Sequence, residues 1–314
     1  AELVRFIART PSVSRAHPIV ISKFVEQAKE LDFDGVASNG RLVLWAISEH
    51  VENAGVHSGD ATLVFPPQRT YLETMRRLKK VSAKIADALA ITGPFNIQCI
   101  AKDNAIQVIE CNLRASRSFP FVSKVSRVNF IDVATDVMMG ERVRTMKGAM
   151  GELDYVGVKA PQFSFTLLEV VDPTVGVEMA STGEVACLGD DFEEAFLKAM
   201  LSVGYHLPIR AVLLSTGPLE SKVSFLEHAR LLLEMGVSLY ATEGTAAFLG
   251  SHGLPVAVLH WPLEARSPNV MEFLQSGKAD LVINIPKNYQ EEELTNDYLI
   301  RRKAVDLAIP LITN

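Results

Sequence analysis

The first 140 residues show a polar and apolar alternation that is typical of half-buried β-strands. Within residues 31–36, Asp32 and Asp34 alternate with apolar neighbours. Asn39 and Gly40 follow as a two-residue turn of the kind that joins antiparallel strands in a hairpin. The same pattern predicts further strands over residues 18–25, 41–48, 95–101 and 105–110.

Two stretches of this first part have apolar residues at helical spacing instead. They are residues 70–91 and residues 129–139. A third apolar run, residues 119–122, reads as the anchor of a loop. Because the strands do not alternate regularly with helices, we expect an α+β fold here.

The pattern changes near residue 208, where strands begin to alternate regularly with helices. Gly236 ends one of these helices as a C-cap. Such alternation predicts an α/β doubly wound parallel sheet. We therefore expect two domains, residues 1–205 and residues 206–314. The second domain's expected strands are 210–215, 237–241, 256–260, 280–285 and 310–313, and its expected helices are 219–235, 242–252, 270–277 and 294–307.

Length and composition are consistent with this division. The chain has 314 residues, about twice the length of a typical domain of ~150 residues. It is 48% hydrophobic and 22% charged, which excludes a disordered or fibrous chain. Its net charge of −6 argues against a broad nucleic-acid surface, and no apolar run is long enough to cross a membrane. Cys99, Cys111 and Cys187 have no metal-site spacing and fit buried thiols.

Oxygen-bearing side chains gather on the strand pair 95–101 and 105–110. Glu110 and Asn112 are two residues apart and face the same way, and Gln98 on the neighbouring strand can approach Glu110 across the hairpin. Three such groups suit Mg²⁺ or Mn²⁺ with nucleotide phosphates completing the shell. The alternative is the ordinary polar face of a hairpin.

Two neighbouring loops could serve the same site. Arg114 and Arg117 could stabilise phosphoryl charge, or they could be surface arginines of a solvated loop. In residues 54–60, glycines flank His57 and Ser58, which could donate hydrogen bonds to a ligand, although a plain loop explains the glycines equally well. We expect His50 to be a structural hydrogen-bonding residue.

The second domain offers a different kind of site. Thr242 and Thr245 lie at a strand-to-helix turn, where hydroxyls and free N–H groups bind phosphate or carboxylate. A plain N-cap by Thr242 is equally consistent. Lys222, Trp261 and Asn284 also follow or flank the carboxyl ends of predicted strands. We therefore expect a small anionic ligand at this edge.

Three long runs make the chain resemble the synthetase region, or large subunit, of carbamoyl phosphate synthetase. They read SEHVENAGVHSGD at 48–60, VIECNLRASRSFPFVSK at 108–124 and MASTGEV at 179–185. The resemblance covers essentially the whole chain. It corresponds to the C-terminal part of the second ATP-grasp unit, followed by the regulatory domain, which is similar to methylglyoxal synthase.

This resemblance implies an ATP-dependent ligase that phosphorylates carbamate to carbamoyl phosphate for pyrimidine, arginine or urea synthesis. It implies ATP and Mg²⁺ or Mn²⁺ as cofactors, with K⁺ as a further candidate. Arg117 would support phosphoryl transfer, and Gln98, Glu110 and Asn112 would hold the metals. The implied nucleotide contacts are Lys23 and Val25 at the adenine, Glu30 at the ribose, and Gly55, Val56, His57, Ser58, Gln98 and Glu110.

The resemblance also implies that Lys222, Thr242, Thr245, Trp261 and Asn284 contact an allosteric effector. Trp261 is typical of the urea-cycle branch, which responds to N-acetylglutamate. Lys287 and Asp297, however, replace asparagines of that branch, and a lysine suits phosphate, so a nucleotide effector is favoured. A true methylglyoxal synthase is disfavoured, because the loop at 215–220 lacks an aspartate that could act as the base.

The start and end of the chain affect the expected activity. The chain begins after the segment that would cover the nucleotide and stops before an expected terminal helix, so a polypeptide of this length alone is expected to be inactive. The competing hypothesis is a non-catalytic, effector-binding module. Expected partners are the rest of the synthetase chain, a separate or fused glutaminase and further subunits of an oligomer, without nucleic acid or membrane. The expected location is cytoplasmic, or mitochondrial in the urea-cycle branch.

Overall fold

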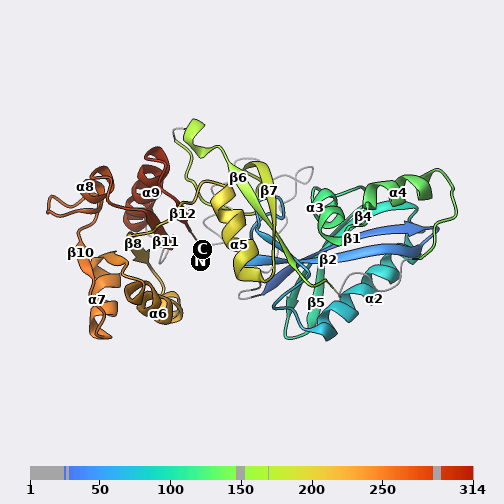
Figure 1. The fold of residues 1–314 in the computed structure, drawn as a ribbon, viewed down its shortest axis with the longest axis horizontal. Helices are drawn as coiled ribbons and strands as arrows, with labels where there is room; N and C mark the ends of the chain where they lie inside the picture. The colour runs from blue at the N-terminus through green and yellow to red at the C-terminus, as the bar shows by residue number, and fades with distance from the viewer. Residues whose placement is uncertain (1–24, 26–27, 146–152, 169, 286–290, 314) are drawn as a thin grey trace, which may run out of the picture.

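The computed structural model describes residues 25, 28–145, 153–168, 170–285 and 291–313, which form two separate β-sheets (Figure 1). The strands of the first sheet lie between residues 29 and 189, and those of the second between residues 211 and 312. Among the sequence-based expectations, the strand at 18–25 falls almost entirely outside the described residues.

The first sheet is antiparallel and has the strand order β5-β4-β1-β2-β3-β6-β7. The hairpin predicted at Asn39 and Gly40 joins β1 to β2, and both residues have the positive φ angles, 47° and 77°, that this tight turn needs. The strands are β1 (Lys29–Ser38), β2 (Arg41–Asn53), β3 (Leu63–Phe65), β4 (Gly93–Lys102), β5 (Ala105–Asn112), β6 (Val156–Phe163) and β7 (Ser181–Gly189).

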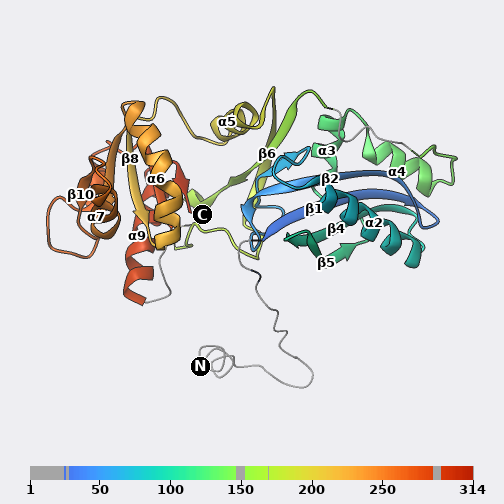
Figure 2. The same ribbon diagram turned by 90° about the horizontal axis from the view of Figure 1, so that it is seen from below.

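Helices cover both faces of this sheet (Figures 1 and 2). On one face, α2 (Leu72–Ala88) packs its apolar side onto Leu31 and Phe33 of β1. On the other face, α3 (Phe119–Ser126) and α4 (Phe130–Met138) bury their aromatic residues against β1 and β2. The helix α5 (Phe192–Ser202) packs on β6 and β7.

Three features of this part were missed by the sequence analysis. The run 119–122 does not anchor a loop but begins the helix α3, whose Pro120 stands at the helix start, where its missing N–H costs nothing. The strands β6 and β7 and the helix α5 were not predicted at all. The α+β prediction itself is confirmed.

The second sheet is parallel, with the order β10-β9-β8-β11-β12, which confirms the doubly wound prediction. Its core alternates residue by residue along β8, where Leu213 faces α8 and α9 while Val212 and Leu214 face α6 and α7. The elements are β8 (Ala211–Thr216), α6 (Leu219–Glu234), β9 (Ser238–Thr242), α7 (Glu243–Ser251), β10 (Ala257–Leu259), α8 (Val270–Gln275), β11 (Leu281–Ile285), α9 (Glu291–Asp306) and β12 (Leu311–Ile312).

Candidate functional site

A polar cavity of about 80 Å³ lies on the face of the first sheet opposite to α2. Side chains from β1, β4, β5 and β6 and from two loops meet there, although they come from positions up to 127 residues apart in the chain, Asp32 to Lys159. The lining residues are Asp32, His57, Ser58, Gly59, Leu63, Asn96, Gln98, Glu110, Asn112, Arg114, Ser116, Arg117, Ser118 and Lys159.

The three oxygen-bearing side chains predicted to converge do so. Gln98 of β4 is the register partner of Glu110 of β5, which confirms the expected pairing. Asn112 donates a hydrogen bond of 2.7 Å from Nδ2 to Oε1 of Glu110, so the carboxylate and the amide share one face of the strand. This places a carboxylate and two amide groups on one wall of the cavity, a donor set that suits a hard divalent cation.

The loop at residues 54–60 lines the cavity through His57, Ser58 and Gly59. Ser58 accepts a 2.7 Å hydrogen bond at Oγ from Gln98 Nε2, and His57 accepts a 3.0 Å bond at Nδ1 from the Gly59 N–H. The prediction that both side chains donate to a ligand stays a prediction, since these contacts are within the protein. Since His57 Nδ1 accepts, a neutral His57 carries its proton on Nε2.

Lys159 of β6 supplies a buried positive charge that the sequence analysis missed. Its Nζ donates to the carbonyl oxygens of Gly59 at 3.2 Å and Ser58 at 3.3 Å, and it lies 3.8 Å from a carboxylate oxygen of Glu184. Burial lowers the pKa of Lys159, while the Glu184 carboxylate acts in the opposite direction. A lysine inside the otherwise apolar run 156–160 was the signal that could have revealed it.

The loop with the two arginines is held by a buried carboxylate. Asp34 accepts hydrogen bonds of 2.6 Å from Ser116 Oγ, 2.6 Å from Ser118 Oγ and 2.9 Å from Asn96 Nδ2. Burial raises the pKa of Asp34 to about 6, and the nearby charge of Asp32 adds to this effect. Asp34 thus fixes the backbone on both sides of Arg117.

Arg117 and Arg114 both line the cavity from this loop, as a role in phosphoryl transfer requires. Arg117 donates to Met179 Sδ at 2.8 Å, and Arg114 donates to the carbonyl oxygen of Ala115 at 3.2 Å. Both guanidinium groups are exposed and can reach an anion in the cavity.

Beneath the cavity, His50 is fully buried and lies 3.0 Å from Asp32, between Nε2 and Oδ2. Burial alone would lower the pKa of His50, but the hydrogen bond and the charge of Asp32 raise it overall. The expected structural role of His50 is consistent with this contact. Within the described residues, Ser48 Oγ and His50 Nδ1 are buried without a hydrogen-bond partner.

Among the remaining predicted nucleotide contacts, Glu30 lies next to the loop at residues 54–60. Glu30 is 5% exposed, and its carboxylate lies 3.5 Å from the Gly55 N–H. Burial raises the pKa of Glu30. Val56 belongs to the core under the loop, Val25 is half-buried, and Lys23 lies outside the described residues.

The predicted effector residues meet at the carboxyl edge of the second sheet, next to the point where the strand order reverses between β8 and β11. Thr242 donates to Ser215 Oγ at 3.4 Å, and Ser215 is the register partner of Asn284. Thr245 exchanges 3.1 Å hydrogen bonds with the backbone of Thr216.

Thr242 stands at the N-cap of α7 but does not cap it, because its hydroxyl bonds to Ser215 instead. Lys222 of α6 reaches the carbonyl of Gly244 at 3.4 Å in the first turn of α7. Trp261, two residues beyond β10, packs partly buried against the sheet core. The α7 N-terminus therefore combines a helix dipole with a lysine, two features that favour an anion, while the hydroxyls of Thr242 and Thr245 bond to Ser215 and Thr216.

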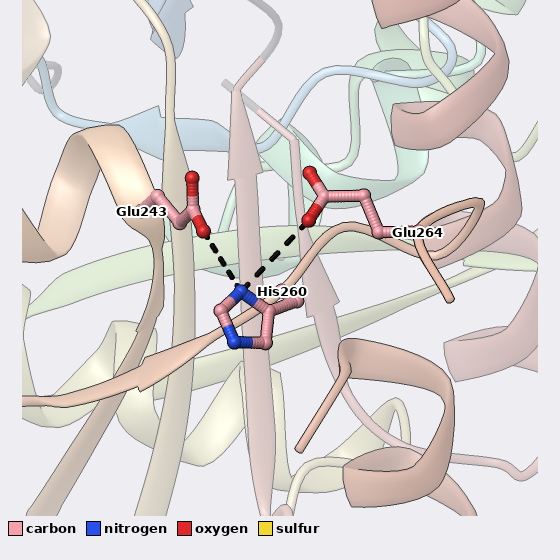
Figure 3. Close-up of side chains that lie close together, drawn as sticks. All are labelled: Glu243, His260 and Glu264. Atoms are coloured by element: carbon pink, nitrogen blue, oxygen red, sulfur yellow. Dashed lines mark hydrogen bonds and ion pairs between the residues drawn. The ribbon is translucent and has the colours of Figure 1, made fainter. Parts of the chain in front are cut away.

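One His/Glu group of the second sheet resembles a metal site among the described residues (Figure 3). The carboxylates of Glu243 and Glu264 approach His260 Nδ1 from two sides, at 2.8 and 3.9 Å. Arg266, however, lies 2.9 Å from Glu243 and 3.5 Å from Glu264. The guanidinium already supplies the positive charge that these carboxylates need, so we assign no metal to this group.

The cysteines agree with a packing role. Cys99 is fully buried, burial raises its pKa to about 12, and Cys111 packs partly buried against the same core. Neither thiol is a nucleophile at neutral pH. Among the described residues, no helix has the length and apolarity needed to span a membrane.

Two family models match the chain. Residues 1–146 match the carbamoyl-phosphate synthase L chain ATP-binding domain, and residues 224–313 match an MGS-like domain. Both matches agree with the resemblance inferred from the sequence.

Long relatives match the whole chain. It is 48% identical over 318 residues to multifunctional protein pyr1-3 of Dictyostelium discoideum and 47% identical over 322 residues to human mitochondrial carbamoyl-phosphate synthase [ammonia]. Each alignment covers 100% of this chain, but the chain spans only 14% and 21% of these relatives. Among solved structures, a bicarbonate-bound biotin carboxylase domain of a thermophilic 2-oxoglutarate carboxylase matches with a TM-score of 0.45 and 13% identity, over 58% of this chain and 47% of that one.

Proposed function

This chain belongs to the carbamoyl phosphate synthase family, and from that premise we propose that it is the part of a synthetase that phosphorylates carbamate with ATP and senses an anionic effector. The observation that supports the catalytic role is the meeting of Gln98, Glu110 and Asn112 with two arginines and Lys159 around one cavity. Phosphoryl transfer needs such a combination of metal-binding oxygens and fixed positive charge.

In this proposal, Glu110, Asn112 and Gln98 hold Mg²⁺, for which Mn²⁺ can substitute. When bound, the metal would neutralise negative charge on the phosphates of ATP. K⁺ is a further candidate cation. The donor set fits, because the carboxylate and the side-chain amides are oxygen ligands on one wall, and Asn112 already bonds to Glu110.

The protein's own residues then position and stabilise the transferred group. A carbamate oxygen attacks the γ-phosphorus, the new O–P bond forms, and the bond to the β–γ bridging oxygen breaks to release ADP. Arg117, Arg114 and Lys159 balance the charge on the equatorial oxygens. His57 and Ser58 contact the phosphates from the loop, and the buried Cys99 takes no part.

The other end of the nucleotide is assigned to residues that the resemblance names. Lys23 and Val25 would contact the adenine, Glu30 the ribose, and Gly55 and Val56 the intervening backbone. The link between Glu30 and Gly55 supports this, because it ties the ribose contact to the loop that contacts the phosphates.

We further propose that the second sheet, within a domain at residues 206–314, binds a small anionic effector. Thr242, Thr245 and Lys222 surround the N-terminus of α7, while Trp261 and Asn284 flank it on the same sheet edge. A nucleotide effector is favoured over N-acetylglutamate because a lysine at position 287 suits phosphate, although Lys287 lies outside the described residues. The rest of the synthetase chain, a glutaminase and further subunits are the expected partners, in the cytoplasm or, for a urea-cycle enzyme, in mitochondria.

The test of the catalytic proposal is the reverse reaction, formation of ATP from ADP and carbamoyl phosphate, in a synthetase chain that includes these residues. Glu110→Gln removes the one carboxylate of the metal set and is expected to lower the rate at least 100-fold. The matched control is Glu73→Gln, which changes an exposed carboxylate paired with Arg77 on α2 and leaves the rate unchanged. Equal rates for the two variants would contradict the proposal.

The alternative is an effector-binding module without catalysis. Calorimetric titration of the 314-residue chain with UMP, UTP, IMP and N-acetylglutamate identifies the effector, and a separate titration with Mg·ATP tests the first cavity. Effector binding without any contribution of Glu110 to the reverse reaction would favour the alternative.

A further inference from the structure

A buried arginine joins the predicted effector edge to the segment that connects β6 to β7 of the first sheet. Arg301 of α9 is only 2% exposed. Its Nε and Nη2 form a fork on the carboxylate of Asp172, at 2.7 and 2.5 Å, and its Nη1 donates to Asn284 Oδ1 at 2.7 Å. A forked pair of this kind fixes both partners in one geometry.

The other half of the Asn284 amide is also occupied. Asn284 is fully buried, and its Nδ2 donates to Asp297 Oδ1 at 2.7 Å. An effector that contacts the Asn284 side chain binds the same amide that holds Asp297 and Arg301, either at its second N–H or second acceptor position or in place of one of these bonds. Either kind of contact alters the surroundings of Arg301 and therefore its hydrogen bonds to Asp172.

We name residues 164–181, which run from the end of β6 to the first residue of β7, the connecting segment. Asp172 belongs to it, and residue 169 of this segment lies outside the described residues. A second arginine holds the same stretch. Arg302 Nη1 donates to the carbonyl oxygens of Phe165, Leu168 and Val171 at 3.1, 2.9 and 3.3 Å. The first half of the connecting segment is thus attached to α9.

The second half of the connecting segment is attached to the cavity. The Gly176 carbonyl accepts the His57 N–H at 2.7 Å, and Met179 Sδ accepts from Arg117 at 2.8 Å. The N–H groups of residues 180 and 181 donate to the Asp60 carboxylate at 2.8 and 2.9 Å. Only three residues lie between Asp172 and Gly176, so a displacement at one end reaches the other over a short stretch of chain.

We propose that Asn284, Arg301 and Asp172 form a relay that couples effector occupancy to the position of His57 and Arg117. Arg301 and Asp172 are positioning residues in this relay, because they act on the cavity through the connecting segment. The relay rests on the proposed effector site, and it deepens that proposal by naming the route of regulation. Coupling is reciprocal, so ligands in the cavity alter effector affinity by the same factor.

The test measures hydrogen exchange of backbone amides in the 314-residue chain. Asp172→Asn removes the charge that holds Arg301, and Asp172 is 38% exposed, so the change leaves the core intact. Without ligand, we expect about tenfold faster exchange at the His57 amide and at the amides of residues 180 and 181. The Val51 amide, bonded to the Thr62 carbonyl, serves as an internal reference and keeps its rate.

Three further variants sharpen the result. Asp154→Asn makes the same change at an exposed aspartate before β6 and is expected to leave all rates unchanged. Asp172→Glu keeps the charge and restores rates to within about twofold. In the double variant Asp172→Asn with Arg301→Gln, no buried arginine is left without its carboxylate partner. This variant should show the same faster amide exchange if loss of the Arg301–Asp172 pair is the cause. Wild-type rates at His57 in Asp172→Asn and in the double variant would overturn the proposal.

A second experiment repeats the hydrogen-exchange measurement with UTP or N-acetylglutamate added as the ligand. In the wild-type chain, binding protects the amides of residues 243–245 and shifts exchange at His57. In Asp172→Asn the protection at 243–245 persists and the shift at His57 is lost. An equal shift at His57 in both proteins overturns the relay. Absence of protection at 243–245 contradicts the effector site instead, while the ligand-free comparison still decides the relay.

Discussion

Asp34 provides a measurable test of how the cavity loop is held. Its side chain is completely buried on the polar face of β1, where Ser116, Ser118 and Asn96 donate to it. Burial raises its pKa from 3.8 to about 6. The replacement Asp34→Asn keeps the shape and most of the acceptor geometry but removes the ionisation.

The sign of the pH dependence follows from this shift. A carboxyl group whose pKa is higher in the folded state binds its proton more tightly there, so its contribution is fully present below pH 3.8 and is lost as the pH rises through about 6. The difference between 3.8 and about 6 corresponds to about 3 kcal/mol of unfolding free energy. Relative to wild type, Asp34→Asn should therefore gain about 3 kcal/mol between pH 4 and pH 8.

The assay is urea unfolding followed by the fluorescence of Trp45, which stacks on Phe33 in the first sheet. A Trp261→Phe background makes Trp45 the reporter of this sheet alone, since the chain has two tryptophans. Burial also raises the pKa values of Glu30 and Glu52, and this makes the unfolding free energy depend on pH in wild type and variant alike. The quantity to compare is therefore the difference in unfolding free energy between wild type and variant at each pH. Parallel curves from pH 4 to 8 would refute the assignment of a buried, ionising Asp34.

Three further predictions concern other parts of the molecule. Lys159→Met removes the buried charge beside the cavity and should lower the rate of ATP formation from carbamoyl phosphate roughly 10²–10³-fold, with the same unfolding midpoint to within a small shift; an unchanged rate would exclude Lys159 from the site. Thr242→Ala should weaken effector binding at least tenfold in calorimetry while costing no more than about 1 kcal/mol of stability, because the Thr242 hydroxyl does not cap α7. Gly157→Ala places a Cβ in steric overlap with Val125 Cγ2 of α3, so the first sheet should lose about 1–3 kcal/mol in urea unfolding, and a wild-type midpoint would show that α3 moves freely.

The convergence of Gln98, Glu110 and Asn112 could be predicted because its geometry is local. Strand periodicity and one short turn suffice to bring Gln98 opposite Glu110, and both lie within 15 residues of each other. The carboxyl edge of the second sheet could be predicted for a related reason, since parallel strands bring their ends to one edge whatever the loops do. In both cases the decisive contacts follow from secondary structure alone.

Lys159 and Asp172 could not be predicted in the same way. Lys159 reaches the cavity from β6, about 100 residues from the carbonyl oxygens it contacts. Asp172 pairs with Arg301 across 129 residues. Such contacts depend on how the strands and the connecting segment pack, which no short-range periodicity encodes. The helix α3 was missed for a different reason, because Pro120 and the aromatic residues of the run suggested a loop.

The most direct test of the central claim is paramagnetic broadening by Mn²⁺·ADP in the amide spectrum of the 314-residue chain, with Mg²⁺·ADP as the diamagnetic reference. The account predicts broadening centred on Gln98, Glu110 and Asn112, with weaker effects at residues 57–58, and its loss in Glu110→Gln. Broadening centred instead on the group of Glu243, His260 and Glu264, or a spectrum that Mn²⁺·ADP leaves unchanged, would contradict the assignment of the first cavity as the nucleotide and metal site.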